Sequence, residues 1–189
     1  MILTEQQTVS PIMDTHELFG LSGRVALATG DSRGLGRLIA AGLLAQGAKV
    51  RISSREGSDC DATAEEPSKI GPCMASPTDA STIDGVRKLA RMISGRESRL
   101  DVSINNAGAA WTVGFENFPG YGWDKVFDLD LKAPFFLTRA LQGPLRHAAR
   151  TRPAKVVNIA SMGGLSAKPR ESYPHSGAKA GLAHITWRI

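Results

Sequence analysis

A glycine-rich turn between an apolar run and an amphipathic stretch constrains the fold more than any other feature of this sequence. Residues 24–28 are apolar enough to form a buried strand, and residues 29–36 then read Thr-Gly-Asp-Ser-Arg-Gly-Leu-Gly. The apolar positions that follow recur at helical spacing: Leu35, Leu38, Ile39 and Leu43. A strand that turns through glycines directly into a helix is typical of the first unit of an open parallel α/β sheet.

The rest of the chain continues this alternation of strands and helices. Further strands are predicted at 49–53, 73–76, 100–104 and 155–160. Helices are predicted at 81–94, at 123–149 with a bend near Gly143-Pro144, and from Tyr173 onward; Pro67 shortens or breaks another at 56–70. The sequence therefore predicts a Rossmann-type doubly wound parallel sheet over residues 21–189, after a flexible leader at residues 1–20.

Composition excludes several other classes of protein. The 189 residues are 42% hydrophobic, which suits one domain with its own core, and no apolar stretch is long enough to span a membrane. The first 23 residues lack the features of a secretory signal, so a cytoplasmic protein is expected. The net charge of +5 is scattered rather than clustered, which argues against nucleic acid. The cysteines and histidines lack metal-ligand spacing, so no metal is predicted.

The glycine turn has the composition of a pyrophosphate-binding loop. Gly30 permits a tight turn, while Gly34 and Gly36 let the backbone approach a ligand closely. The helix that follows supplies amide donors and positive potential at its N-terminus. A tight turn without any ligand is the alternative, and the later motifs count against it.

The residue that ends the second strand predicts which dinucleotide is bound. NAD sites place an acid there, whereas NADP sites place an arginine near the 2′-phosphate. Here the strand ends at Ser54-Arg55, and Arg33 adds a second cation. Asp31 and Glu56 oppose a phosphate at the same end of the sheet. NADP(H) is therefore favoured and NAD(H) stays open, with two solvated arginines as the alternative.

Four motifs occur in the order TGxxxGxG, Asn105-Asn106-Ala107-Gly108, Ser161, and Lys179 preceded four residues earlier by His175. This set resembles the short-chain dehydrogenase/reductase family, in which a tyrosine stands where this chain has His175. Residues 122–129 and 133–138 are similar to NADPH-dependent 3-oxoacyl-[acyl-carrier-protein] reductases. The resemblance implies strand order 3-2-1-4-5-6-7 and reduction of a small-molecule ketone or 3-oxoacyl thioester to the alcohol, with a homo-oligomer possible.

The resemblance also implies the cofactor contacts. Asp79 and Ala80 match positions beside the adenine, and Asn106, Ala107 and Gly108 match positions beside the nicotinamide ribose. Taken alone, the asparagine motif is also an ordinary turn after a strand. The whole expected set is Gly30, Ser32, Arg33, Gly34, Leu35, Gly36, Arg55, Asp79, Ala80, Asn106, Ala107, Gly108 and Lys179.

Two of the implied catalytic positions are altered. The resemblance implies that Ser161 holds the carbonyl oxygen, a tyrosine delivers the proton, Lys179 assists the tyrosine and binds the ribose, and an asparagine orders a relay water. His175 replaces the tyrosine, and the ammonium of Lys179 together with an oxidised nicotinamide favours a neutral imidazole. Neutral imidazole is a very weak acid but can act as a base. A His175 that merely fills the site is the alternative.

Asp130 replaces the relay asparagine, and an ionised carboxylate accepts hydrogen bonds but does not donate them. It is expected either to pair with Lys179 or to lie in solvent, neutralised by Lys132. Tyr173 lies six residues before Lys179 and cannot easily replace the missing tyrosine. The sequence stops ten residues after Lys179, so the sheet is expected to be incomplete at its C-terminal edge. A non-catalytic nucleotide-binding remnant or partner subunit is therefore the alternative function.

Overall fold

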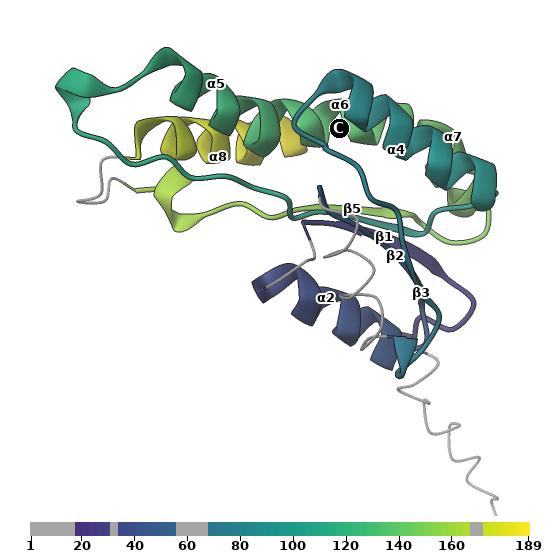
Figure 1. The fold of residues 1–189 in the computed structure, drawn as a ribbon. Coiled ribbons are helices and arrows are strands. Elements are labelled where there is room, and N and C mark those ends of the chain that lie inside the picture. Colours follow the sequence, from purple (N-terminus) through teal and green to yellow (C-terminus); the bar gives the residue numbers. More distant parts are fainter. Residues whose placement is uncertain (1–17, 31–33, 56–67, 167–171) are drawn as a thin grey trace, which may run out of the picture.

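The computed structural model describes residues 18–30, 34–55, 68–166 and 172–189, and these form a five-stranded parallel sheet (Figure 1). The strand order is β3-β2-β1-β4-β5, which confirms the predicted Rossmann-type α/β topology. β3 and β5 are the two edges of this sheet. The strands are β1 Val25–Thr29, β2 Lys49–Ser53, β3 Cys73–Ala75, β4 Val102–Asn105 and β5 Lys155–Asn158.

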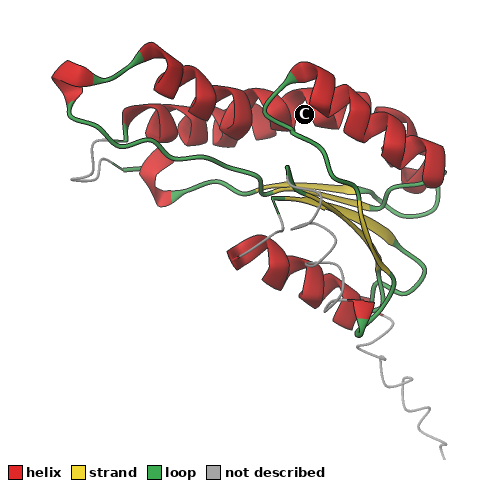
Figure 2. Ribbon diagram, viewed as in Figure 1, coloured by secondary structure: helices red, strands yellow, loops and turns green. Residues whose placement is uncertain are grey.

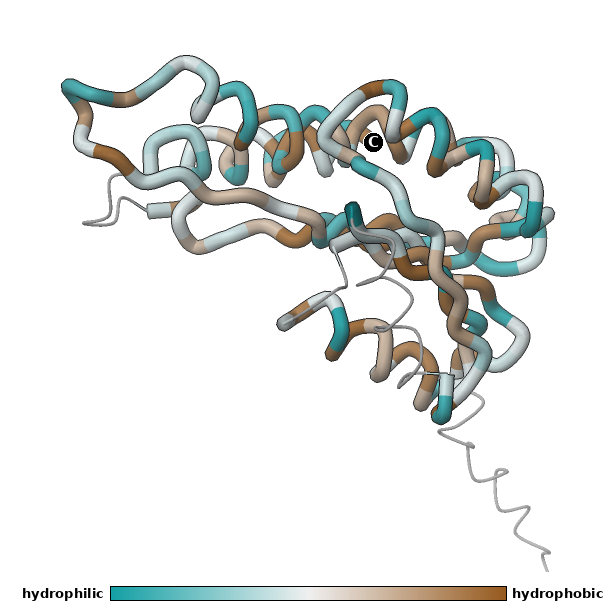
Figure 3. The backbone as a smooth tube through the Cα atoms, in the orientation of Figure 1, coloured by the Kyte–Doolittle hydropathy of each residue, from teal (hydrophilic) through white to brown (hydrophobic). Residues whose placement is uncertain are grey.

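Alternating side chains of β1 enter two separate cores, one on each face of the sheet. Ala26 and Ala28 pack toward α2 (Gly34–Ala45), which covers one face and is the only helix there among the described residues. Val25 and Leu27 pack on the opposite side, against α4 (Ile83–Arg96) and the helices beside it. Figures 1 and 2 show α4, α5, α6, α7 and α8 together on that second face, and Figure 3 shows hydrophobic residues concentrated along the strands between the two layers.

The long helix predicted at 123–149 is divided into segments. α5 (Gly120–Phe127) leads into a π-helical turn at Asp128–Lys132, and α6 (Ala133–Ala140) and α7 (Gln142–Ala149) follow. The break between α6 and α7 falls at Leu141, whose φ of −92° and ψ of 7° are not helical, rather than at Gly143-Pro144. In the π turn the amide of Ala133 donates to the carbonyl of Asp128, five residues earlier. Turns of this kind inside α-helices occur frequently at functional sites.

A buried ion cluster joins β2 to the end of α4. The guanidinium of Arg51 donates to Oε1 of Glu97 from Nε at 2.9 Å, and the Lys49 ammonium reaches the same oxygen at 2.7 Å. Arg51 and Glu97 are both buried. Burial alone would raise the pKa of Glu97, but the hydrogen bonds from Lys49 and Arg51 outweigh it and hold that pKa below its usual value.

Two expectations fall wholly or mostly on residues outside the described ranges: the leader at residues 1–20 and the helix at 56–70 that contains Pro67. α8 (Tyr173–Thr186) begins at the predicted residue, and α4 lies within two residues of its predicted limits. Among the helices of the described ranges, none combines the length and the apolar character that crossing a membrane requires.

We expect Glu97→Ala to destabilise the fold strongly, because it leaves the buried Arg51 guanidinium without its carboxylate. Removing one partner of a buried ion pair costs about 3–5 kcal/mol. Asp84→Ala is the matched control on the same helix, since its pair with Arg87 is exposed and such pairs contribute at most about 1 kcal/mol. Urea unfolding of both variants measures the difference, and equal losses would contradict the role given to the buried cluster.

Candidate cofactor-binding and active site

A cavity of about 300 Å³ lies at the carboxyl ends of β1, β2 and β4, where open α/β sheets bind their ligands. It brings together residues from the glycine turn, the end of β2, the loop after β3 and the loop after β4, whereas Lys179 of the predicted cofactor-binding set lies outside its lining. Its lining consists of Thr29, Gly30, Leu35, Gly36, Ser53, Ser54, Arg55, Thr78, Ala80, Asn106, Ala107, Gly108 and Leu129.

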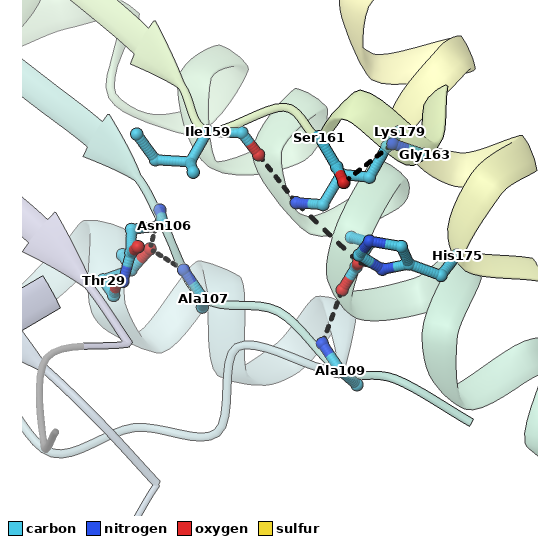
Figure 4. Close-up of polar contacts among 10 residues, drawn as sticks. Thr29, Asn106, Ala107, Ala109, Ile159, Ser161, Gly163, His175 and Lys179 are labelled. Atoms are coloured by element: carbon cyan, nitrogen blue, oxygen red, sulfur yellow. Dashed lines mark hydrogen bonds and ion pairs between the residues drawn. The ribbon is translucent and has the colours of Figure 1, made fainter. Parts of the chain in front are cut away.

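Hydrogen bonds join the glycine turn to the loop after β4 at this cavity (Figure 4). The hydroxyl oxygen of Thr29 accepts from the amides of Asn106 and Ala107, both at 3.2 Å. The side-chain amide of Asn106 donates back to the carbonyls of Thr29 at 2.9 Å and Gly30 at 3.1 Å. Asn106 therefore lines the cavity as predicted, but its amide nitrogen holds the two loops together.

Gly30 is required by this close approach of the two loops. A Cβ at Gly30 would lie 2.6 Å from Cα of Ala107, and the residue has a φ of +76°. Both observations exclude a larger residue without displacement of the backbone. The tight turn predicted at Gly30 therefore needs glycine because Ala107 packs directly against it.

The cavity fits the phosphates of a dinucleotide. α2 begins at Gly34, so the amides of its first turn lie at the cavity beside Leu35 and Gly36, with no acidic residue in that turn. A Cβ at Gly34 would meet no described atom within 4 Å. Arg55 adds a cation to the lining. The predicted contacts Ser32 and Arg33 lie outside the described residues.

Of the two residues predicted to lie beside the adenine, Ala80 lines the cavity and Asp79 does not. Asp79 is exposed and accepts a hydrogen bond from the amide of Ser81 at 3.0 Å. Sequence reasoning missed Ser53 and Thr78, whose hydroxyls lie 3.1 Å apart in the lining. The available signal was their position, since each lies at or just beyond the carboxyl end of a predicted strand.

Asp130 is the centre of a second group of polar side chains beside the cavity. Its side chain is fully buried, and the π turn carries it inward from the helix. Oδ1 accepts from the amide of Ala109 at 2.6 Å, and Oδ2 lies 3.0 Å from Nδ1 of His175 and 3.7 Å from Nζ of Lys179 (Figure 4). The carboxylate therefore joins the loop after β4 to α8.

This geometry corrects one of the two expectations for Asp130. The carboxylate is not solvated and does not pair with Lys132, because the Lys132 ammonium contacts Asp128 at 3.0 Å instead. The pairing with Lys179 is present, and His175 is a closer partner that sequence reasoning missed. The missed contact depends on the inward turn of the π segment, which the sequence pattern did not predict.

Lys179 is buried as well, so it is not an ordinary exposed helical lysine. Its ammonium donates to the carbonyl of Ile159 at 2.7 Å, just beyond β5. Burial lowers the pKa of Lys179, an effect that Asp130 opposes. Burial likewise raises the pKa of Asp130, against the opposing effects of Lys179, the Ala109 amide and His175. Both shifts make proton exchange within the cluster easier than it would be between the same groups in water.

Ser161 and His175 flank the same glycine. A Cβ at Gly163 would lie 3.5 Å from Oγ of Ser161 and 3.9 Å from Cδ2 of His175. Oγ of Ser161 accepts from the amide of Gly163 at 3.1 Å, so this serine also caps the short 3-10 turn Met162–Gly164. Tyr173 packs instead against Phe115 and Phe118, with ring centroids 5.6 and 5.8 Å away, consistent with the prediction that it does not replace His175.

The cavity and the buried cluster meet at Gly108. Gly108 lines the cavity, and a Cβ there would lie 3.2 Å from Oδ1 of Asp130. Leu129, the neighbour of Asp130 in the chain, lines the same cavity. Asp130, Ser161, His175 and Lys179 are not part of the cavity lining, so the predicted catalytic residues form an adjoining site rather than the floor of the cavity itself.

A parallel sheet with a cavity at its carboxyl end and an adjoining buried lysine is the arrangement expected of a Rossmann-fold oxidoreductase. Residues 24–189 match the family described as short chain dehydrogenase, and the chain belongs to that family. It is 41% identical over 172 residues to the rhamnolipids biosynthesis 3-oxoacyl-[acyl-carrier-protein] reductase of Pseudomonas aeruginosa, covering 90% of this chain and 67% of that protein.

Solved structures agree with this assignment. The Pseudomonas aeruginosa RhlG/NADP active-site complex superimposes with a TM-score of 0.85 at 40% identity, covering 88% of this chain and 66% of that one. A metagenomic short-chain oxidoreductase in complex with NADP gives a TM-score of 0.81 at 29% identity, covering 89% and 75%. This chain thus spans about two thirds of the length of the Pseudomonas relatives.

We expect Gly164→Ala to distort the active site and destabilise the protein. A Cβ at Gly164 would lie 2.6 Å from the amide nitrogen of Ala180 and 3.1 Å from Cβ of Lys179, so the turn after β5 must move away from α8. Overpacking of this kind costs about 1–3 kcal/mol. Gly42→Ala is the control, because it lies inside α2 with no atom within 4 Å, and it should stabilise by about 0.5–1 kcal/mol. Thermal unfolding should separate the two variants, and a stabilised Gly164→Ala would contradict the close packing.

Proposed function

We propose that this chain is an NADP(H)-dependent oxidoreductase that interconverts a ketone or 3-oxoacyl thioester and the corresponding alcohol. The observation that carries the proposal is the junction at Gly108 between the glycine-turn cavity and the buried Asp130–Lys179 pair. A dinucleotide held by the cavity lining would supply the hydride chemistry beside this junction. A purely structural cavity would not require a buried carboxylate and a buried ammonium beside it.

The proposed roles follow from what each side chain contacts. Gly30, Gly36 and the first turn of α2 would hold the pyrophosphate, and Arg55 would hold a 2′-phosphate. The bound nicotinamide would donate or accept the hydride. Ser161 would orient the substrate oxygen, and Lys179 would bind the ribose in exchange for part of its present contact with Ile159. The prediction that His175 occupies the proton-transfer position is supported by its place beside Asp130.

The names of the relatives and an apolar recess support the substrate class. The 41% identical relative is a 3-oxoacyl-[acyl-carrier-protein] reductase. In this chain a recess of about 390 Å³ reaches Tyr173, which stands two residues before His175 in α8. Its remaining lining is Phe115, Phe118, Pro119, Gly120 and Trp123. Such a lining suits an acyl chain or another apolar substituent better than a polar polyol.

We expect the chain to bind NADPH more tightly than NADH, and Arg55→Ala to abolish most of the preference. A charge-assisted contact to the 2′-phosphate contributes about 1.5–3 kcal/mol, which corresponds to about a tenfold to hundredfold loss of NADPH affinity. Arg87→Ala is the matched control, because Arg87 is exposed on α4 and is not part of the cavity lining. Calorimetric titration measures both cofactors, and equal affinity for NADPH and NADH in the unsubstituted chain would overturn the NADP assignment.

The second candidate function is nucleotide binding without turnover, and the observation that favours it is His175 in place of a phenolic proton donor. We expect slow NADPH-dependent reduction of 3-oxoacyl thioesters, because positioned proton transfer contributes about 10²–10⁴-fold and neutral imidazole donates poorly. Absorbance at the NADPH band follows the reaction. Tight binding of NADPH with no turnover in either direction would establish the second candidate, whereas rapid reduction would show that His175 is a competent donor.

A further inference from the structure

We propose that Asp130 and His175 form a matched carboxylate–imidazole pair, in which Asp130 keeps a proton on Nδ1 of His175 and so makes Nε2 the base for alcohol oxidation. The inference rests on the proposed function and assigns the direction in which the altered site works best. His175 is the catalytic residue in this arrangement, and Asp130 is a positioning residue that acts through it.

The first step of the argument is the fixed orientation of the carboxylate. Oδ1 of Asp130 accepts from the backbone amide of Ala109 at 2.6 Å, and a backbone amide can only donate. Oδ2 therefore faces α8, where it lies 3.0 Å from Nδ1 of His175. Full burial of Asp130 removes water as a competing partner. The carboxylate cannot rotate away without leaving the Ala109 amide unsatisfied.

The second step is the tautomer that this orientation selects. The Ala109 amide and the Lys179 ammonium both favour the ionised form of Asp130. An ionised carboxylate is an acceptor only, so the hydrogen bond to Oδ2 then requires a proton on Nδ1. Nε2 of a neutral His175 is then the nitrogen with a lone pair. The side chain of His175 is 26% exposed, so the ring is open to a small molecule that enters beside it. A neutral histidine without Asp130 would have no such constraint on its proton.

The third step is the balance of charge during the reaction. In alcohol oxidation the hydroxyl proton passes to Nε2, the hydride on the same carbon passes to the oxidised nicotinamide, and the carbon–oxygen bond becomes a carbonyl. His175 then carries both ring protons, and its positive charge faces the Asp130 carboxylate at 3.0 Å. Lys179 works against that charge, but its ammonium is drawn toward Oδ2 of Asp130 and the carbonyl of Ile159.

Asp130→Asn tests the pair because it preserves shape and reverses one hydrogen bond. The asparagine oxygen must stay on the Ala109 amide, so its NH₂ group would face Nδ1 of His175 and force the proton to Nε2. Nitrogen-15 NMR of the ring nitrogens distinguishes the two tautomers and needs neither cofactor nor turnover. We expect the Nδ1–H form in the unsubstituted chain, the Nε2–H form in Asp130→Asn, and no change in the control Asp128→Asn. An Nε2–H form or an even mixture in the unsubstituted chain would overturn the proposal, even if Asp130→Asn failed to fold.

A cycle of substitutions supplies the kinetic test. With His175 present, Asp130→Asn should lower the NADP⁺-dependent oxidation of a 3-hydroxyacyl thioester by up to about 10⁴-fold, as a wrong tautomer does elsewhere. NADP⁺ affinity is measured for each variant, because Asp130 contacts Lys179, which is proposed to bind the ribose. In a His175→Tyr background the same Asp130→Asn change should raise activity. If the unsubstituted chain does not bind NADP⁺, the proposed function is rejected, while the tautomer of His175 can still be measured by NMR. If Asp130→Asn changes the oxidation rate in the same direction in both backgrounds, the matched pair is rejected.

Discussion

The burial of one carboxylate determines how the active site is built. Asp130 has no exposed surface, and a buried charge is tolerated only where hydrogen bonds and opposite charges compensate for the lost water. The compensation comes from three groups in two separate parts of the chain: the amide of Ala109 after β4, and the side chains of His175 and Lys179 in successive turns of α8. These contacts fix the position of α8 relative to the loop after β4. The same contacts bring an imidazole, an ammonium and Gly108 of the cavity lining around one carboxylate.

The cavity itself depends on a different constraint, the close approach of two loops at the carboxyl end of the sheet. Thr29 and Asn106 exchange hydrogen bonds with the backbone of the opposite loop, and Gly30 leaves the space for Ala107. The glycine turn therefore stabilises the packing of the two loops whether or not a ligand is bound. The fold and the ligand site share these residues, which explains why a short glycine pattern at a strand end predicts so much of the structure.

Sequence reasoning predicted most of the fold because apolar periodicity and glycine placement are local signals. The β1 strand, the helix after it and the start of α8 at Tyr173 all follow from residues adjacent in the chain. The NADP preference and the roles of Ser161 and Lys179 stay predictions. The partnership of Asp130 with His175 could not be predicted, because the π turn at Asp128–Lys132 changes which face of the helix Asp130 occupies. The sequence placed the bend near Gly143-Pro144, whereas the helix breaks at Leu141. Proline marks a bend only approximately, and Pro144 is accommodated in the first turn of α7.

The altered site also depends on the last strand of the described sheet. Ile159 follows β5, and its carbonyl accepts a hydrogen bond from the Lys179 ammonium. Ser161 lies two residues further along the chain. β5 is held to the sheet by its pairing with β4 and by the side-chain bond from Asn105 to Asn158 at 2.7 Å. Its own side chains are only partly covered, and Val157 is 41% exposed. Any movement of β5 therefore displaces Ile159 and Ser161 together, while Asp130 is bonded to the loop after β4 and His175 lies in α8. The geometry between the Asp130–His175 pair and Ser161 thus depends on how firmly this edge strand is held.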